Sequence, residues 1–528
     1  MASRISISAL AGITSLFALR AKAEMTAGRP GHGFIGYGIT MYDPPCAYAC
    51  NGAISAPLNC TDAEMGDTDM TDMPMKKRMN MGGDSVPSDL PSGDGWMVMA
   101  PTPACKANDD FFLQTLAYCI NDRCSDLTVA ALEKYWINNV AGTQLNQPLP
   151  KKSYGEALTA AVISNPTRVL NNTIHLNYTA IVTDDQWYPT YSADANFESV
   201  EITHERYGLV IFLTGAIIPI GLSLLRFLPW PPSLKTRFNA YLIDPPLWGS
   251  QHAAALWGFG VMPTRGQGLF IGYLWLINIV LSAAGYWIVW PMVWWDAQSG
   301  EVIAYIANRV GVLSFANLPL VFLYAGRNNV LLWLTNWSHS TFLLIHRWIA
   351  FICMLQAVLH SVLYLYVYMN TPGDDHSTES KLPYWYWGVI GTLSLSILIP
   401  ASILPLRQKV YETFLASHIV LSILALIGCF LHIYFRFVHQ WGYETWLYIT
   451  VAVWAFDRLV RIFRTIRGGI RRAVVTSIDD DYLRVDILGY CDWPCLSTLP
   501  YAKYLAYLGK PPLLRGRHHH AQARVGNI

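Results

Sequence analysis

Four histidines in two apolar stretches are the residues of this chain whose type and spacing could do chemistry. His346 and His360 lie in one stretch, His418 and His432 lie in another, and each pair is separated by the same fourteen positions. Because a helix turns about 100° and rises about 1.5 Å per residue, both histidines of a pair would share one face, roughly 21 Å apart along the axis. Two such helices side by side present two facing histidine pairs, one near each surface of a membrane. This geometry suits two haems, each held by two histidines, that pass electrons across the membrane.

The simpler interpretation of any one of these histidines is a packed or helix-end residue with a satisfied hydrogen bond. An ionisable side chain inside a membrane span is nevertheless a candidate functional residue. Four of them in two equal spacings favour the ligand interpretation over the structural one.

The composition is typical of a membrane protein. Hydrophobic residues make up 53% of the 528 residues and charged residues only 14%. The net charge of +1 gives no indication of a nucleic-acid partner, so the lipid membrane is the expected one. The length exceeds that of a typical single domain and indicates at least two parts.

The first 23 residues are typical of a secretory signal peptide. Arg4 precedes the apolar stretch of residues 5–19, and Ala21-Lys22-Ala23 is a small-x-small cleavage site. The alternative, a first transmembrane helix, is disfavoured because the apolar run is short for a bilayer.

Residues 24–205 are then expected outside the cell as a small, partly helical domain tied by disulfides. A stretch near residues 131–163 has helical character. The segment contains six cysteines, and an even number in a secreted segment suggests disulfides, although fifteen pairings are possible. These are Cys46, Cys50, Cys60, Cys105, Cys119 and Cys124. Asn59, Asn171 and Asn177 begin Asn-x-Thr acceptor sites for glycosylation.

From residue 206 the chain becomes apolar, and residues 206–465 are predicted to form a transmembrane domain of seven helices. The expected fold class is therefore an all-α membrane protein, a seven-helix bundle with bis-histidine haem sites. The predicted spans are 207–228, 268–290, 310–326, 341–368, 385–404, 412–435 and 443–463.

Basic residues in alternate loops predict the orientation, because cytoplasmic loops carry an excess of lysine and arginine. The first loop and the segment after the last span are basic, so we expect an extracellular N-terminus and a cytoplasmic C-terminus in the plasma membrane. The second loop, with Glu301 and Arg309, is expected outside. His346 and His418 would then hold the inner haem, and His360 and His432 the outer one.

The local sequence resembles the transmembrane domain of fungal ferric and cupric metalloreductases. The resemblance rests on His346-Arg347-Trp348, His360-Ser361, Tyr364, the second histidine pair and Phe456-Asp457-Arg458, and it covers roughly residues 206–485. NADPH oxidases share the architecture but typically shorten the second histidine pair by one residue. The equal spacing therefore favours a metalloreductase over a superoxide-producing oxidase, which remains the alternative.

The resemblance implies a ferric-chelate reductase used in metal uptake. Cytosolic NADPH would reduce FAD, FAD would feed the inner of two haem b groups, and the outer haem would reduce extracellular ferric or cupric chelates. By the same resemblance His346, His360, His418 and His432 are the axial haem ligands. Arg347 could pair with a haem propionate, or it could be an ordinary positive-inside anchor.

Residues 466–528 are expected to form a cytoplasmic tail that begins an incomplete flavin-binding barrel. Residues 473–487 resemble the first strands of that barrel, but no His-Pro-Phe-Ser/Thr flavin motif and no Gly-rich nucleotide loop follow. FAD and NADPH sites are thus not expected in this sequence. Three explanations stay open: a truncated gene model, a separate reductase partner, or a non-catalytic haem-binding protein. Iron-uptake proteins are further candidate partners.

A methionine cluster in the extracellular part offers a second site. Thioether sulfur suits Cu(I), the product of cupric reduction, whereas the alternative is a linker of biased composition. The predicted copper ligands are Met70, Met73, Met75, Met79 and Met81.

Overall fold

The computed structural model describes most of the chain between residues 33 and 507. The described ranges are 33–60, 101–142, 147–250, 255–256, 260–295, 297–370, 376–437, 441–469, 473–477, 482–488 and 501–507. They divide into two compact units, a larger one up to Ala325 together with Val330–Val453, and a smaller one of Gly326–Asn329 with the described part of Trp454–Ile528. The predicted signal peptide lies outside the described residues.

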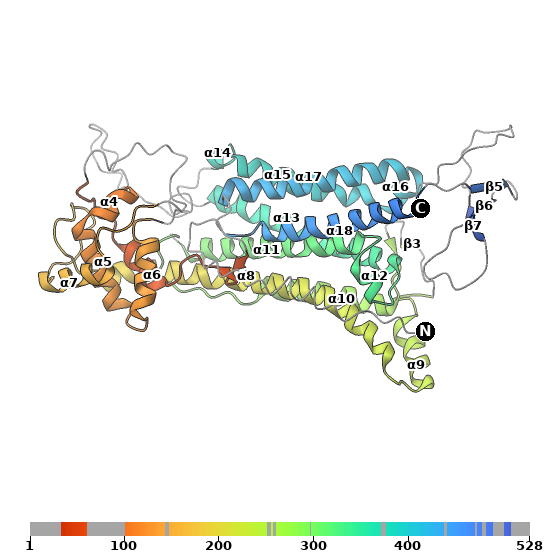
Figure 1. Ribbon diagram of the computed structural model, residues 1–528, viewed down its shortest axis with the longest axis horizontal. Coiled ribbons are helices and arrows are strands. Elements are labelled where there is room, and N and C mark those ends of the chain that lie inside the picture. Colours follow the sequence, from red (N-terminus) through yellow and green to blue (C-terminus); the bar gives the residue numbers. More distant parts are fainter. Residues whose placement is uncertain are drawn as a thin grey trace. The chain divides into compact units, whose positions relative to one another are not determined.

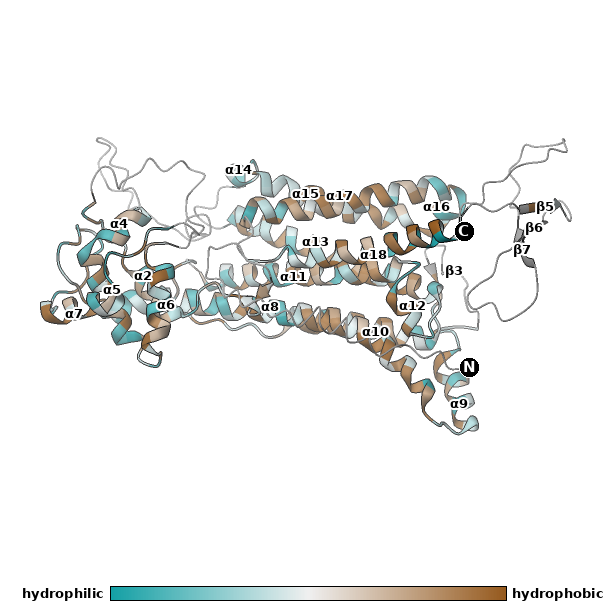
Figure 2. Ribbon diagram, viewed as in Figure 1, coloured by the Kyte–Doolittle hydropathy of each residue, from teal (hydrophilic) through white to brown (hydrophobic). Residues whose placement is uncertain are grey.

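Six helices of the described ranges are long and apolar enough to cross a membrane. Figure 2 shows apolar residues along the middle of these helices, labelled as in Figure 1. They are α8 (Asp184–Leu224), α10 (Arg265–Ala283), α11 (Gln298–Ala325), α13 (His339–Asn370), α15 (Pro383–Leu398) and α17 (Tyr411–Phe437). The prediction of an all-helical membrane domain is therefore confirmed at the level of about six spans.

The predicted seventh span is present as a helix, α18 (Thr445–Gly468), but it is not among these six. Asp457, Arg458 and Arg461 interrupt its apolar sequence and lower its hydropathy. The count of seven is therefore not confirmed. The second half of α18 belongs to the smaller unit.

The helices that carry the histidines pack against two neighbours. α13 lies along α11 over most of its length, and α17 lies along α15. A buried triangle of amides joins α10, α11 and α13: Asn317 donates to Asn278 (2.8 Å) and to Gln356 (2.9 Å), and Gln356 donates to Asn278 (3.1 Å). In lipid, such interhelical hydrogen bonds satisfy polar groups that have no water to bind.

The described N-terminal part is largely helical, where the sequence predicted a partly helical domain. Its helices are α2 (Pro45–Ala53), α4 (Pro103–Asn108), α5 (Asp110–Arg123), α6 (Val129–Asn139) and α7 (Tyr154–Ser164). Three disulfides pair all six cysteines, as Cys46–Cys124, Cys50–Cys119 and Cys60–Cys105. Two of them join α2 to α5 or to Cys124 directly after it, and α2 packs on the first part of α8.

Helix α8 runs without interruption through the predicted domain boundary at residue 205. A capping box of Thr183 and Gln186 begins it. Its first half packs on the N-terminal domain and its second half is apolar, so one helix belongs to both parts. A short parallel pair, β1 (Phe34–Ile35) and β2 (Gly38–Ile39), contacts α8 as well.

The structure corrects the prediction that Glu301 and Arg309 lie in an external loop. Both residues lie within α11 and are fully buried. Arg309 donates to the carbonyl oxygens of Leu281 (2.8 Å) and Ala284 (2.7 Å), and Glu301 accepts from Asn196 (3.4 Å). These partners come from other elements, which a hydropathy pattern does not reveal.

Shorter elements connect the long helices. The larger unit contains α9 (Pro232–Phe238), the π-helical turn η2 (Asn239–Ile243), the hairpin β3 (Ala255–Leu256) and β4 (Gly260–Val261), α12 (Val330–Leu334), α14 (His376–Glu379) and α16 (Leu404–Lys409), with 3₁₀ turns η1 (Leu225–Phe227) and η3 (Pro400–Ser402).

The smaller unit contains an antiparallel sheet at the place where the sequence resembles the start of a flavin-binding barrel. β5 (Ala473–Ser477) pairs with β6 (Tyr482–Leu488), and β6 pairs with β7 (Tyr501–Tyr507). The first two strands match the predicted stretch, whereas β7 was not expected.

Candidate functional site

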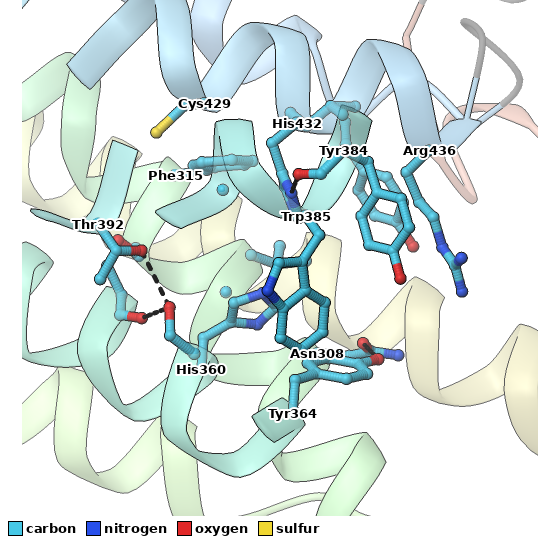
Figure 3. Close-up of a pocket in the computed structure, with 18 of the residues that line it drawn as sticks. Asn308, Phe315, His360, Tyr364, Tyr384, Trp385, Thr392, Cys429, His432 and Arg436 are labelled. Carbon is cyan, nitrogen blue, oxygen red and sulfur yellow. Dashed lines mark hydrogen bonds between the residues drawn. The ribbon is translucent and has the colours of Figure 1, made fainter. Parts of the chain in front are cut away.

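The four histidines form two facing pairs between α13 and α17. The ring centroids of His346 and His418 are 6.3 Å apart, and those of His360 and His432 are 6.2 Å apart. The second pair is shown in Figure 3, where the two rings approach one another from different helices. Equal spacing on both helices keeps both pairs in register.

These separations fit one metal ion between each pair of rings. With metal–nitrogen bonds of about 2.0 Å and a ring centroid roughly 1.1 Å behind its nitrogen, two opposed imidazoles place their centroids about 6.2 Å apart. Two side chains at this distance cannot hydrogen-bond directly, so the gap between them suits a group that binds both.

The ring nitrogens that face away from the gap have partners on neighbouring elements. Nδ1 of His346 lies 2.9 Å from the carbonyl oxygen of Val321, and Nδ1 of His360 lies 2.8 Å from that of Ala307. A carbonyl oxygen only accepts, so in both cases Nδ1 must donate. Nε2 is then the unprotonated nitrogen, as metal binding requires.

The histidines of α17 have equivalent partners. Nδ1 of His432 lies 2.8 Å from the carbonyl oxygen of Tyr384, in the first turn of α15. Nδ1 of His418 lies 3.2 Å from the hydroxyl of Ser402. Each of the four rings is therefore oriented by a hydrogen bond at Nδ1, which fixes the direction of Nε2.

Two glycines make room for the outer histidine rings. A Cβ atom on Gly311 would lie 2.7 Å from Nδ1 of His360, and a Cβ atom on Gly388 would lie 2.7 Å from Nδ1 of His432. Both distances are well inside van der Waals contact. The neighbouring helices α11 and α15 can therefore approach the outer pair only with glycine at these positions.

A cavity of about 380 Å³ surrounds the outer pair. Its wall is mostly apolar, with a few polar side chains, as is typical of cofactor sites. Figure 3 shows His360, Tyr364, Tyr384, His432 and Arg436 around it. The cavity therefore leaves space beside two candidate ligand side chains.

Arg436 is a site residue that the sequence prediction missed. It lies one helical turn after His432, lines the cavity and is only 9% exposed. Its guanidinium lies over the ring of Tyr384 (4.6 Å), 3.5 Å from the Tyr368 hydroxyl and 3.8 Å from the Glu379 carboxylate. The predicted span ended at residue 435, although an arginine at the end of an apolar helix that carries a histidine was a usable signal.

Arg347, the predicted propionate partner, follows His346 in α13 and is partly buried. Arg407 of α16 is its electrostatic neighbour. The inner pair is thus accompanied by two cations, and the outer pair by Arg436.

The predicted copper ligands, the methionines of residues 70–81, lie outside the described residues. Within the described ranges, no three histidine, cysteine or acidic side chains converge to form a metal site made of protein alone.

The fold and the histidine pairs define a class, a multi-pass membrane protein with two facing pairs of histidines on two of its membrane helices. Comparison with known proteins then shows what the chain is similar to. Residues 310–429, which include three of the four histidines, match the family described as "Ferric reductase like transmembrane component".

Fungal relatives extend this match. The chain is 29% identical over 414 residues to "Ferric reductase transmembrane component 3" of Saccharomyces cerevisiae, covering 73% of this chain and 55% of that protein. It is 30% identical over 261 residues to "Ferric/cupric reductase transmembrane component 1" of Candida albicans, covering 48% of this chain and 33% of that protein. "Ferric reductase transmembrane component 4" of S. cerevisiae is 32% identical over 289 residues, which cover 52% of this chain and 39% of that protein.

The chain is therefore a relative of the fungal ferric and cupric reductase transmembrane components, and the predicted resemblance is confirmed. It spans about half the length of the first of these relatives and a smaller share of the others.

Proposed function

We propose that this chain holds two haem b groups in series and passes electrons across the plasma membrane to Fe(III) or Cu(II) outside the cell. The observation that carries the proposal is the pair of centroid separations, 6.3 and 6.2 Å, between His346 and His418 and between His360 and His432. Each bound haem would supply a one-electron redox centre whose two axial positions are both occupied.

The side chains around each pair support this role. The four histidines would bind the haem irons through Nε2, because Nδ1 of each ring already has a hydrogen-bond partner. Arg436 can neutralise a haem carboxylate at the outer site, and Arg347 at the inner one, since guanidinium binds carboxylates strongly. The wall of the outer cavity is mostly apolar, which suits the apolar ring of a haem.

Direction and substrates follow from the orientation and from the relatives. The basic loops favour a cytoplasmic position for His346 and His418, so electrons would enter there and leave near His360 and His432. We propose cytosolic NADPH and FAD as the electron donors. Their binding sites would lie in parts of the protein beyond the described residues or in a partner reductase. Metal acceptors are favoured over O₂ because the relatives bear the names of ferric and cupric reductases.

The test is a spectroscopic and kinetic experiment on the purified, membrane-expressed chain. We expect two haems per chain with a low-spin bis-histidine spectrum. After chemical reduction, Fe(III) or Cu(II) chelates should reoxidise them faster than O₂ does. Absence of bound haem would refute the proposal, and faster reoxidation by O₂ with release of superoxide would favour the oxidase alternative.

A further inference from the structure

Helix α8 buries three ionisable side chains that the electron path does not use. Glu201, His204 and Glu205 are each 0% exposed. Burying such groups away from water is costly unless they are paired. Because they lie near the outer end of the membrane-spanning part of α8, they require a structural or functional explanation.

Two of the three side chains, Glu201 and His204, form a buried ion-pair contact, and both glutamates accept hydrogen bonds from other elements. Nδ1 of His204 lies 3.3 Å from Oε2 of Glu201. The same oxygen accepts a hydrogen bond from the Tyr443 hydroxyl (2.8 Å), and Oε1 accepts from the Asn308 amide (3.1 Å). Glu205 accepts from the indole of Trp446 (3.0 Å). Both oxygens of Glu201 thus accept a hydrogen bond, and the carboxylate and the imidazole are both groups that can bind a proton.

The network reaches the outer cavity directly. Tyr443, Asn308 and Tyr364 all line that cavity, and the Tyr364 hydroxyl donates to Oδ1 of Asn308. The Tyr364 ring lies 5.0 Å from the ring of His360. A continuous hydrogen-bonded path therefore leads from the Glu201–His204 pair to a side chain in contact with an outer histidine.

The ionisable groups around the pair come from four elements. α8 itself adds Glu198 and Glu205, α11 adds Glu301, Tyr305 and Arg309, α13 adds Tyr364, and the segment before α18 adds Tyr443. Burial and the Glu201 carboxylate raise the pKa of Tyr443 above its ordinary value, so its hydroxyl stays protonated and donates. The charge of Arg309 is held by carbonyl oxygens and by the rings of Tyr207 and Tyr286.

We propose that the Glu201–His204 pair is a proton-binding site that balances charge at the outer haem. This inference rests on the proposed function, since it requires a haem between His360 and His432. Addition of an electron at that site would be accompanied by uptake of a proton from solution at the pair. When the metal substrate removes that electron, the proton returns.

The physical reason is electrostatic. In a low-dielectric interior, added negative charge favours the protonated form of a nearby ionisable group, and proton binding in turn favours reduction. The coupling is reciprocal, so the reduction potential of the outer haem must depend on pH.

The test is a redox titration of the purified two-haem chain at several pH values, followed by absorbance. We expect the potential of the outer haem to fall as pH rises, and the inner haem to respond less. Glu201→Gln keeps the size of the side chain and one acceptor oxygen but removes the charge, so it should flatten the pH dependence of the outer haem while both haems remain bound. Glu156→Gln, a fully exposed carboxylate in α7 whose capping role glutamine can fill, is the matched control and should leave the slope unchanged.

His204→Gln serves as a second variant if Glu201→Gln loses haem. A two-haem spectrum with a pH-independent outer potential in the unmodified chain would overturn this inference alone. So would an unchanged slope in either haem-loaded variant. An unmodified chain with no bis-histidine spectrum would overturn the proposed function as well.

Discussion

Gly311 lies directly behind the ring of His360. A Cβ atom at Gly311 would lie 2.7 Å from Nδ1 and 3.1 Å from the next ring carbon. Nδ1 donates to the carbonyl of Ala307, one turn earlier on the same helix α11. Helix α11 therefore orients this histidine in two ways. The Ala307 carbonyl accepts its hydrogen bond, and Gly311, which has no side chain, leaves room for the ring.

The first prediction concerns this contact. Gly311→Ala should displace the His360 ring, break its bond to Ala307 and lower haem occupancy at the outer site, while the inner site keeps its haem. The measurement is haem content per chain, with the spectrum of the remaining haem. Gly272→Ala in α10, where a Cβ atom meets nothing within 4 Å, is the matched control and should bind both haems.

The histidines themselves give the second prediction. Alanine at His346, His360, His418 or His432 should abolish ferric reduction at the cell surface, because each removes one of two axial ligands. We expect loss of about one haem per chain, measured on a well-expressed variant. His339→Ala, at the first residue of α13, is the control. Retained reductase activity in any ligand variant would remove that histidine from the electron path.

Arg436 gives the third prediction. Arg436→Gln removes a buried cation one turn from His432, so the outer haem should become harder to reduce and its potential should fall. A lost hydrogen bond to a charged group costs about 1.5–3 kcal/mol, or roughly 10- to 100-fold in haem affinity. The measurements are a redox titration and the haem affinity. Arg436→Lys keeps a positive charge, so it should recover part of the lost potential and affinity. An unchanged potential in Arg436→Gln would show that its charge does not act on the site.

The fourth prediction concerns the N-terminal domain. Cys50→Ser with Cys119→Ser removes a link between α2 and α5 that closes a separation of 69 residues. Loss of a native disulfide costs about 2–4 kcal/mol of stability. Limited proteolysis should therefore cut this domain sooner, while the haem spectrum is retained. Ser164→Ala, at the end of α7, should leave the protease resistance unchanged.

Much of the architecture was predictable because helix periodicity and hydropathy are local properties. The spacing of His346 and His360 placed them on one face of α13, and the apolar stretches located the membrane helices. The even cysteine count predicted a disulfide-tied domain, but the pairing needed the fold. The predicted seventh span is not confirmed, because α18 is helical but carries several charged residues toward its end and is not among the six apolar helices.

The sequence by itself determined which helices carry the paired histidines, since fourteen residues complete nearly four turns whatever the surroundings. Only the tertiary structure decided what surrounds them. Glu301 and Arg309 look like loop charges in sequence, but partners from other helices allow them to be buried. Glu201 meets Tyr443, 242 residues further along the chain, only because α8 packs against the segment before α18. A hydropathy pattern reflects only that burying a charged side chain is unfavourable. The hydrogen bonds that offset this free-energy cost come from residues distant in sequence, which are brought near only by packing.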